Sequence, residues 1–180
     1  MDSRKAKGYI LGFVAAATYG LNPLFALPLM NDGMDTSSIL LFRYLLAIPI
    51  VALMMAVRGR SFAVTFRQLG LLVVFGLLLG ISSISLFESY RYMDAGIAST
   101  LLFIYPLMVA VIMSAFFHER MSRLTIICLT AALAGIGLLY KGEGGGTLSP
   151  VGTVIVMLSA LTYAVYIVGI NTVSYTHLTL

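Results

Sequence analysis

The sequence predicts an all-α fold, a polytopic bundle of helices that cross a membrane. Of its 180 residues, 60% are hydrophobic and 10% are charged, and the mean hydropathy is +1.01. Such a chain is too apolar to cover a water-soluble domain with polar groups. Its apolar stretches also last about 20 residues each, which is the length that an α-helix needs to cross a bilayer.

Six apolar stretches have the length of membrane spans. We expect them at Gly8–Leu29, Ser37–Val57, Gln68–Glu88, Ala95–Phe117, Leu124–Tyr140 and Val151–Val173. The first follows a basic flank, as in a signal peptide, but its apolar part is too long and further spans follow. We therefore interpret it as an uncleaved first helix.

The basic residues gather in alternate loops. One side of the membrane has Arg4, Lys5 and Lys7, then Arg58, Arg60 and Arg67, then Arg120 and Arg123. The other side has only Arg91 and Lys141. By the positive-inside rule, the N-terminus is predicted to be cytoplasmic in a multi-pass protein of the cytoplasmic membrane.

The sixth span resembles the first, which suggests an internal repeat. Gly8, Ala16, Thr18 and Tyr19 recur at identical spacing as Gly152, Ala160, Thr162 and Tyr163. Because an odd number of spans precedes the repeat, a second unit would enter the membrane inverted, an architecture common in secondary transporters. Chance similarity between two apolar helices is the alternative.

This repeat divides the chain into four parts. Residues 1–140 form a first transmembrane unit, 141–150 a glycine-rich extracytoplasmic loop, and 151–173 the first helix of a second unit. Residues 174–180, SYTHLTL, resemble a translated sequencing adapter, so we expect an artificial or frayed end. The chain is then a truncated fragment that would transport only with a second copy or with its missing second half.

Prolines inside the spans mark candidate positions on a substrate pathway. Pro23 has no amide proton, so the carbonyl of Tyr19 is freed in the first span beside Asn22. Freed groups are tolerated in a bilayer where protein or a water-filled cavity satisfies them. Pro28, Pro49 and Pro106 free carbonyls in the same way, and Tyr105-Pro106 is the most central pair. A purely structural kink, with Asn22 bonded to a neighbouring helix, is the alternative.

Three charged residues lie at or inside the spans. Arg43 is about 9 Å along its helix from Ser37, a depth at which an unpaired charge is costly. It either attracts an anionic group, holds a carboxylate such as Glu88, or extends to the interface. Glu88 and Glu119 are structural or gating candidates, and an interfacial anchor and a helix-end salt bridge are their simpler interpretations.

Several tyrosines and glycines lie within the spans. Tyr19, Tyr44, Tyr105, Tyr163 and Tyr166 could line a cavity, although core packing is the simpler role for each. Gly76 and Gly80 are expected to allow close approach between helices.

An enzyme is disfavoured by what the spans contain. His118 and His177 are isolated, no paired aspartates occur, and no lysine lies inside a span to hold a cofactor as a Schiff base. We expect no cofactor, no metal site and no nucleic-acid partner. The partners expected are the lipid bilayer and a small-molecule substrate, while a channel or a structural membrane subunit remains the alternative.

Four stretches resemble the EamA-type transporters of the drug/metabolite transporter superfamily. They are FRYLL at Phe42–Leu46, DAGIASTLLFIYPL at Asp94–Leu107, HERMS at His118–Ser122 and AGIGLL at Ala134–Leu139. Arg43, Pro106 and Glu119 fall on signature positions of that pattern. His118 stands where the family usually has glycine.

The resemblance implies one five-helix unit over residues 8–140 and the beginning of a second, inverted unit from Val151. It also implies a central cavity between the two units and transport of amino acids, metabolites or drugs by alternating access. The sequence leaves the substrate, the direction of transport and proton coupling open.

Overall fold

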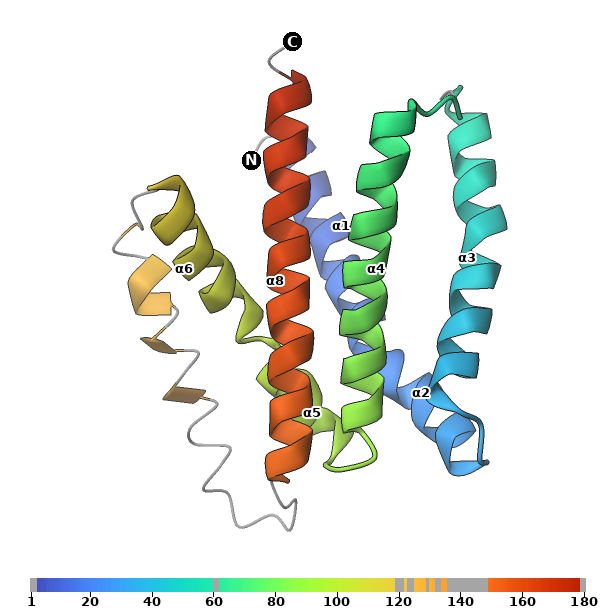
Figure 1. The fold of residues 1–180 in the computed structure, drawn as a ribbon, viewed down its shortest axis with the longest axis vertical. Coiled ribbons are helices and arrows are strands. Elements are labelled where there is room, and N and C mark those ends of the chain that lie inside the picture. Colours follow the sequence, from blue (N-terminus) through green and yellow to red (C-terminus); the bar gives the residue numbers. More distant parts are fainter. Residues whose placement is uncertain are drawn as a thin grey trace. The chain divides into compact units, whose positions relative to one another are not determined.

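The computed structural model describes residues 3–59, 62–118, 122, 125–128, 130–131, 134–135 and 149–178, with side chains between Ala6 and Val173. This part of the chain is helical apart from short turns and loops (Figure 1), which confirms the predicted all-α membrane bundle. The longer helices are α1 (Ser3–Gly20), α2 (Asn22–Asn31), α3 (Thr36–Val57), α4 (Phe66–Ser89), α5 (Ala95–Leu102), α6 (Tyr105–Phe117) and α8 (Pro150–Leu178).

Five of the six predicted spans are present as helices long and apolar enough to cross a membrane. They are Ala6–Asn31, Thr36–Val57, Phe66–Ser89, Ala95–Phe117 and Pro150–Val173. Each agrees with its prediction to within a few residues, because the apolar length of a segment fixes its extent in a bilayer. Most of the remaining predicted span, 124–140, and most of the predicted loop at 141–150 lie outside the described residues.

The chain divides into two compact units, Met1–Arg43 and Tyr44–Leu180. In the first, α1 and α2 are separated at Leu21, whose amide still donates to the Ala17 carbonyl at 3.2 Å. After α2, Gly33 turns the chain with a φ of +88°, a conformation that favours glycine. The buried residues of this unit are Ala26, Thr36, Ile39 and Leu40.

In the second unit, α8 contacts α4, α5 and α6. The buried face of α8 repeats every fourth residue, as a helix face requires, and consists of the small or short side chains of Val156, Ala160, Ala164 and Val168. Small residues let helix backbones approach closely where no hydrophobic effect drives them together. Helix α8, which the sequence assigns to a second transmembrane unit, therefore packs against α4, α5 and α6.

A reciprocal pair of serines joins α4 and α8. The Ser159 hydroxyl donates to the Ser82 carbonyl at 2.7 Å, and the Ser82 hydroxyl donates to the Ser159 carbonyl at 3.0 Å. The two hydroxyl oxygens are 3.2 Å apart, and Ser159 is fully buried. Polar side chains of this kind connect helices where lipid offers no hydrogen-bond partner.

The glycines at the close helix contacts are not the ones that the sequence suggested. Among the described residues, nothing lies within 4 Å of a Cβ built on Gly76 or Gly80, so the expectation of close approach there was wrong. A Cβ on Gly152 would instead lie 2.7 Å from the Met93 methyl group, and one on Gly169 would lie 2.5 Å from the Phe75 ring. A spacing of small residues indicates that a helix can approach a neighbour but not which face does so.

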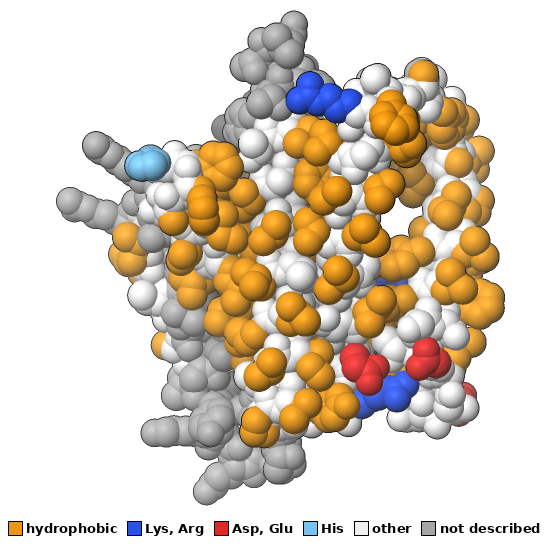
Figure 2. All heavy atoms as spheres, in the orientation of Figure 1, with side chains coloured by type: hydrophobic (Ala, Val, Ile, Leu, Met, Phe, Trp, Pro, Cys, Tyr) orange, Lys and Arg blue, Asp and Glu red, His pale blue; other side chains and the backbone are white. Residues whose placement is uncertain are grey.

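The outer surfaces of α4 and α8 are apolar. Leu77 and Val154 are exposed by 61% and 69%, and Figure 2 shows hydrophobic side chains along the visible sides of both helices. Such a surface suits lipid and not water.

The two repeat-related threonines share a local structure. The Thr18 hydroxyl donates to the carbonyls of Val14 and Ala15, both at 2.9 Å. The Thr162 hydroxyl donates to the corresponding carbonyls of Leu158 and Ser159, at 2.9 and 3.0 Å. In each helix, the hydroxyl is thus satisfied by the preceding turn of its own backbone.

Helix α6 ends at a residue in the left-handed conformation. His118 has φ 54° and ψ 27°, and its amide donates to the Met113 carbonyl. A helix commonly ends in this way with glycine, which has no Cβ to clash. The turn that a glycine would make is therefore retained with histidine, at a conformational cost of about 1 kcal/mol.

Replacing Ser159 with valine should lower the free energy of unfolding by about 2 kcal/mol, because it overpacks a buried contact and removes the bonds between α4 and α8. Chemical unfolding in micelles measures the change. Thr162→Val is the matched control, since among the described residues the Thr162 hydroxyl bonds only carbonyls of its own helix. Equal losses in the two variants would contradict this account of the contact.

Replacing His118 with glycine should raise the free energy of unfolding by about 1 kcal/mol, because glycine adopts a positive φ without strain. His118→Ala keeps the Cβ and should show no such gain. Thermal unfolding of both variants in the same detergent distinguishes relief of strain from loss of the imidazole. A gain for alanine as large as that for glycine would reject the strain.

Candidate functional site

The span Ala95–Phe117 is interrupted in its middle. Helix α5 ends at Leu102 and α6 begins at Tyr105, and Figure 1 shows the two as separate stretches that pass beside α8. The amides of Phe103 and Ile104 make short turns to the Thr100 and Leu101 carbonyls, each at 3.1 Å. These bonds close the end of α5, while Pro106 starts α6 without an amide proton.

Two carbonyls at this break have no hydrogen bond within the described part of the chain. The amides of Leu107 and Met108 both donate to the Ile104 carbonyl, at 3.0 and 3.2 Å, which leaves the carbonyls of Leu102 and Phe103 without a donor. Leu102 is only 5% exposed. Unpaired backbone groups at membrane depth occur where they face protein or a water-filled cavity.

Three tyrosines form a cluster beside the break. The rings of Tyr105 and Tyr163 meet edge to face, with centroids 4.8 Å apart and planes at 84°. Tyr163 and Tyr166, one helical turn apart on α8, are 5.9 Å apart with planes at 23°. All three are half-buried, and among the described residues their hydroxyls have no hydrogen-bond partner. The structure thus brings together two of the predicted pathway residues, Tyr105 and Tyr163, next to a third, Pro106.

Phe75 extends this cluster toward the beginning of α4. Its ring meets the Tyr166 ring edge to face, with centroids 6.2 Å apart and planes at 85°. Phe75 also lines a pocket of about 270 Å³ between the first turns of α4 and the last part of α8. The aromatic rings therefore form a continuous series, which we call the aromatic track: Phe75, Tyr166, Tyr163 and Tyr105.

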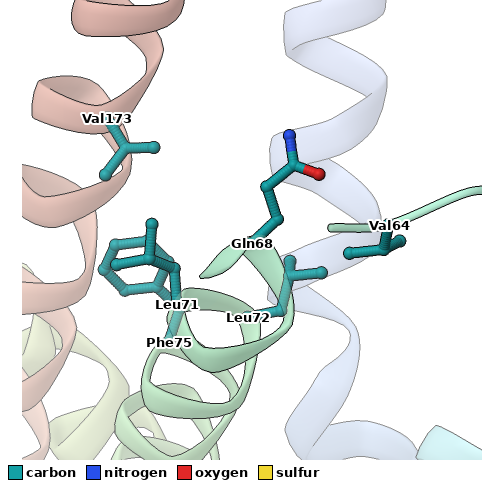
Figure 3. Close-up of a pocket in the computed structure, with 6 residues that line it drawn as sticks. All are labelled: Val64, Gln68, Leu71, Leu72, Phe75 and Val173. Carbon is teal, nitrogen blue, oxygen red and sulfur yellow. The ribbon is translucent and has the colours of Figure 1, made fainter. Parts of the chain in front are cut away.

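The pocket is almost entirely apolar. Figure 3 shows Leu71 and Phe75 on α4 facing Val173 on α8, with Val64 from the preceding loop on the far side of Leu72. Among the described lining residues, Gln68 alone is polar. Its side-chain oxygen accepts a hydrogen bond from the Thr65 amide at 2.9 Å and so caps α4. The pocket can therefore hold an apolar group and offers a single amide as a polar contact.

Tyr44 is placed by α3 and bonds a different helix. Its hydroxyl and the Ser83 hydroxyl are 2.7 Å apart, which links α3 to α4. Tyr44 does not contact the aromatic track through any ring pair in the described residues. Its predicted place on the pathway stays a prediction.

Glu88 forms an ion pair at the end of α4. Its carboxylate is 3.4 Å from Arg91, three residues later, and both side chains are partly exposed. This geometry suits an anchor at the membrane surface. Arg43 belongs to the other compact unit, so its pairing with Glu88 stays a prediction.

The remaining candidates of the first unit surround the break between α1 and α2. Tyr19 is 45% exposed near the end of α1, while Asn22 and Pro23 begin α2 and are half-buried. Pro28 and Pro49, which the sequence also suggested as breaks, lie inside α2 and α3, and those helices continue through them. Only Pro23 and Pro106, each in the first turn of its helix, mark interruptions in the described spans.

Two further predictions concern Glu119 and the absence of a metal or cofactor. Glu119 lies outside the described residues. Within them, no group of three His, Cys, Asp or Glu side chains could hold a metal ion. The expectation of no cofactor stays a prediction.

Sequence reasoning noted Tyr166 only as one of several inner tyrosines and missed Phe75. The i, i+3 spacing of Tyr163 and Tyr166 was an available signal, because residues three apart share a helix face. No comparable signal pointed to Phe75, whose role depends on where α8 packs against α4.

Comparison with known proteins identifies the family. No curated protein and no solved structure matches the chain. The model of the EamA-like transporter family matches residues 6–141, which include most of α1 and all of α2 to α6 but not α8. The match covers most of the chain and contains the interrupted span that carries Tyr105. The chain therefore belongs to the EamA-like transporter family, a family of membrane transporters of the drug/metabolite type.

Proposed function

We propose that the protein is a secondary transporter that moves small metabolites, amino acids or drugs across the cytoplasmic membrane by alternating access. The observation that carries this proposal is the interrupted span at Phe103–Ile104, with the ring of Tyr105 packed on Tyr163. An interruption at membrane depth disrupts backbone bonding and is found where transporters bind their substrates. A purely structural helix bundle has no need of it.

The aromatic track supports a route to this interruption. Phe75 lines the pocket at the beginning of α4, and the rings of Tyr166 and Tyr163 lead from it to Tyr105. Aromatic rings present an apolar face and, in tyrosine, a polar edge, so they suit solutes of mixed character. We propose that solutes enter at the pocket and are bound beside the break.

The proposal also includes a second, inverted transmembrane unit, which is distinct from the two compact units of the described structure. Residues 1–140 would form one unit and 151–173 the first helix of another, and a second copy or a further segment would complete the wall of the pathway. The exposed apolar side of α8, with Val154 at 69% and Leu158 at 48%, is available for such a unit as well as for lipid.

Flux through the proposed pathway should saturate and should depend on Tyr163. We expect proteoliposomes that hold several copies each to accumulate members of a panel of labelled amino acids and amphipathic drugs, and vesicles with single copies to accumulate none. Tyr163→Leu should lower uptake about tenfold, because it removes the ring that packs on Tyr105. Tyr9→Leu, a change at a residue 75% exposed on α1, is the control. Uptake that rises linearly with concentration would indicate a channel and contradict the proposal.

We also propose a cytoplasmic N-terminus, from the excess of basic residues in alternate loops. In a Cys128→Ser background, a cysteine at Asp32 should react with a membrane-impermeant maleimide in intact cells. A cysteine at Arg58 should react only after permeabilisation. Both positions are exposed turns next to the ends of α2 and α3. The reverse labelling pattern would invert the topology.

A further inference from the structure

We propose that the pocket between α4 and α8 binds one acyl chain of an anionic phospholipid, whose phosphate group pairs with Arg67. The pocket is lined by Val64, Gln68, Leu71, Leu72, Phe75 and Val173. This inference goes beyond the proposed function, because it concerns a lipid that the protein would hold and not a solute that it would carry.

The pocket has the chemistry and the access that a lipid chain needs. Five of its six lining side chains are apolar, and its volume is about 270 Å³. Leu72 and Val64 are exposed by 56% and 49%, so the pocket opens at the surface of the helices. Figure 3 shows Val173 on one side of it and Val64 on the other, with Leu71 and Leu72 between them. An apolar opening on a membrane-spanning helix meets hydrocarbon, so an acyl chain is the occupant that the surroundings supply.

The pocket lies at the ends of two spans, where the polar headgroups of a bilayer begin. The span Phe66–Ser89 starts beside it, and the span Pro150–Val173 finishes at one of its lining residues. A lipid bound here would therefore have its headgroup beside the loop before α4 and its tail along the first turns of α4.

The segments that form the pocket carry positive charge and no acid. Arg58 and Arg67 are exposed at the two ends of the loop between α3 and α4, and the sequence has Arg60 between them. No Asp or Glu occurs from Arg58 to Phe87, and α8 contains none. The acid of α4, Glu88, lies about 32 Å further along the helix at 1.5 Å per residue. Basic clusters at the ends of membrane helices attract anionic lipid headgroups.

Arg67 is the residue best placed to hold the phosphate. It precedes Leu71 by four residues, so both lie on the same side of α4. The stem of an arginine can run along apolar surface while its guanidinium reaches the headgroups, where it binds phosphate through two parallel hydrogen bonds. The Gln68 oxygen accepts the Thr65 amide, which leaves the Gln68 NH₂ group to donate to an ester oxygen of the same lipid.

A tryptophan reporter tests the site, because the sequence contains no tryptophan of its own. Leu72→Trp places the reporter at the pocket, and Leu77→Trp, 61% exposed on another side of α4, is the matched control. The full chain is reconstituted in mixed vesicles of phosphatidylglycerol and phosphatidylcholine, with brominated chains on one lipid or the other to quench the fluorescence. Phosphatidylglycerol should be preferred about fivefold at position 72 and less than about twofold at position 77. Equal preference at the two positions would overturn the inference.

Substitution of Arg67 tests the charge. In the Leu72→Trp chain, Arg67→Gln should lower the preference for phosphatidylglycerol to less than about twofold, whereas Arg67→Lys keeps the charge and should retain most of it. Arg91→Gln removes a cation at the other end of α4 and should leave the preference unchanged. A preference that survives Arg67→Gln would reject the assigned phosphate contact.

A soluble probe separates the lipid from free phosphate. Glycerol 3-phosphate has the charged head without a chain, so at millimolar concentration it should leave quenching by brominated phosphatidylglycerol unchanged. Its displacement of the lipid would assign the site to a free phosphate and reject the role of the pocket.

If Leu72→Trp fails to fold, thermal unfolding of the unaltered chain in detergent decides the question. Added dioleoyl phosphatidylglycerol should raise the midpoint more than dioleoyl phosphatidylcholine does, and Arg67→Gln should remove the difference. Equal shifts with the two lipids would reject the site.

Lipid binding and transport fail separately. Because the proposed solute route begins at this pocket, a bound chain and an entering solute would exclude each other. The quenching is measured without solute, so it decides the lipid site whether or not the vesicles show uptake. Saturable uptake together with equal quenching by the two lipids would keep the transporter and reject the lipid site.

Discussion

The hydrogen bonding of the backbone in an apolar environment is the constraint on which this structure depends. A membrane interior offers no water to N–H and C=O groups, so each span must satisfy its own backbone as a helix. The described spans do so along almost their whole length. Where Pro106 begins a new helix, the carbonyls of Leu102 and Phe103 have no donor among the described residues. Pro23 also begins a new helix. The tyrosine cluster of the compact unit Tyr44–Leu180 lies beside Pro106.

The contact between α4 and α8 determines what surrounds the interruption at Phe103–Ile104. Ser159 is locked to Ser82 by reciprocal hydrogen bonds, and Tyr163 follows it by one helical turn. The tyrosine rings therefore project from a helix whose position is set by buried polar bonds and by small side chains at the contact. Gly169 lets α8 lie close to the Phe75 ring. Phe75 belongs to the aromatic track and also lines the pocket, so it connects the two. Loss of the serine contact would shift the position of Tyr163, because Ser159 and Tyr163 lie on the same helix.

Membership of the EamA-like transporter family and the local physics agree at His118. The resemblance noted in the sequence implies glycine at this position, and the backbone of His118 adopts the left-handed conformation that favours glycine. The turn after α6 is therefore a property of the fold that this chain keeps at a cost in strain. Strain of this kind persists only where the surrounding structure imposes it.

The sequence by itself determined the membrane class and the five described spans, and it named Pro23 and Pro106 among four prolines at which it predicted breaks. These follow from local properties: apolar length sets a span, and a missing amide proton disrupts the helical bonding around it. It also identified Tyr105 and Tyr163 as candidates without showing that they meet. Gly76 and Gly80, in contrast, have the composition of contact residues but lie at no close contact within the described chain.

Only the tertiary structure decided which helix faces meet. Three contacts join residues far apart in the chain: the hydrogen bonds between Ser82 and Ser159, the ring contact of Tyr105 with Tyr163, and the ring contact of Phe75 with Tyr166. In a bilayer both faces of a helix can be apolar, so hydrophobic periodicity does not distinguish the face that meets lipid from the face that meets protein. That choice is made by small residues, hydroxyls and rings that fit one another, and such complementarity exists only once the helices are packed.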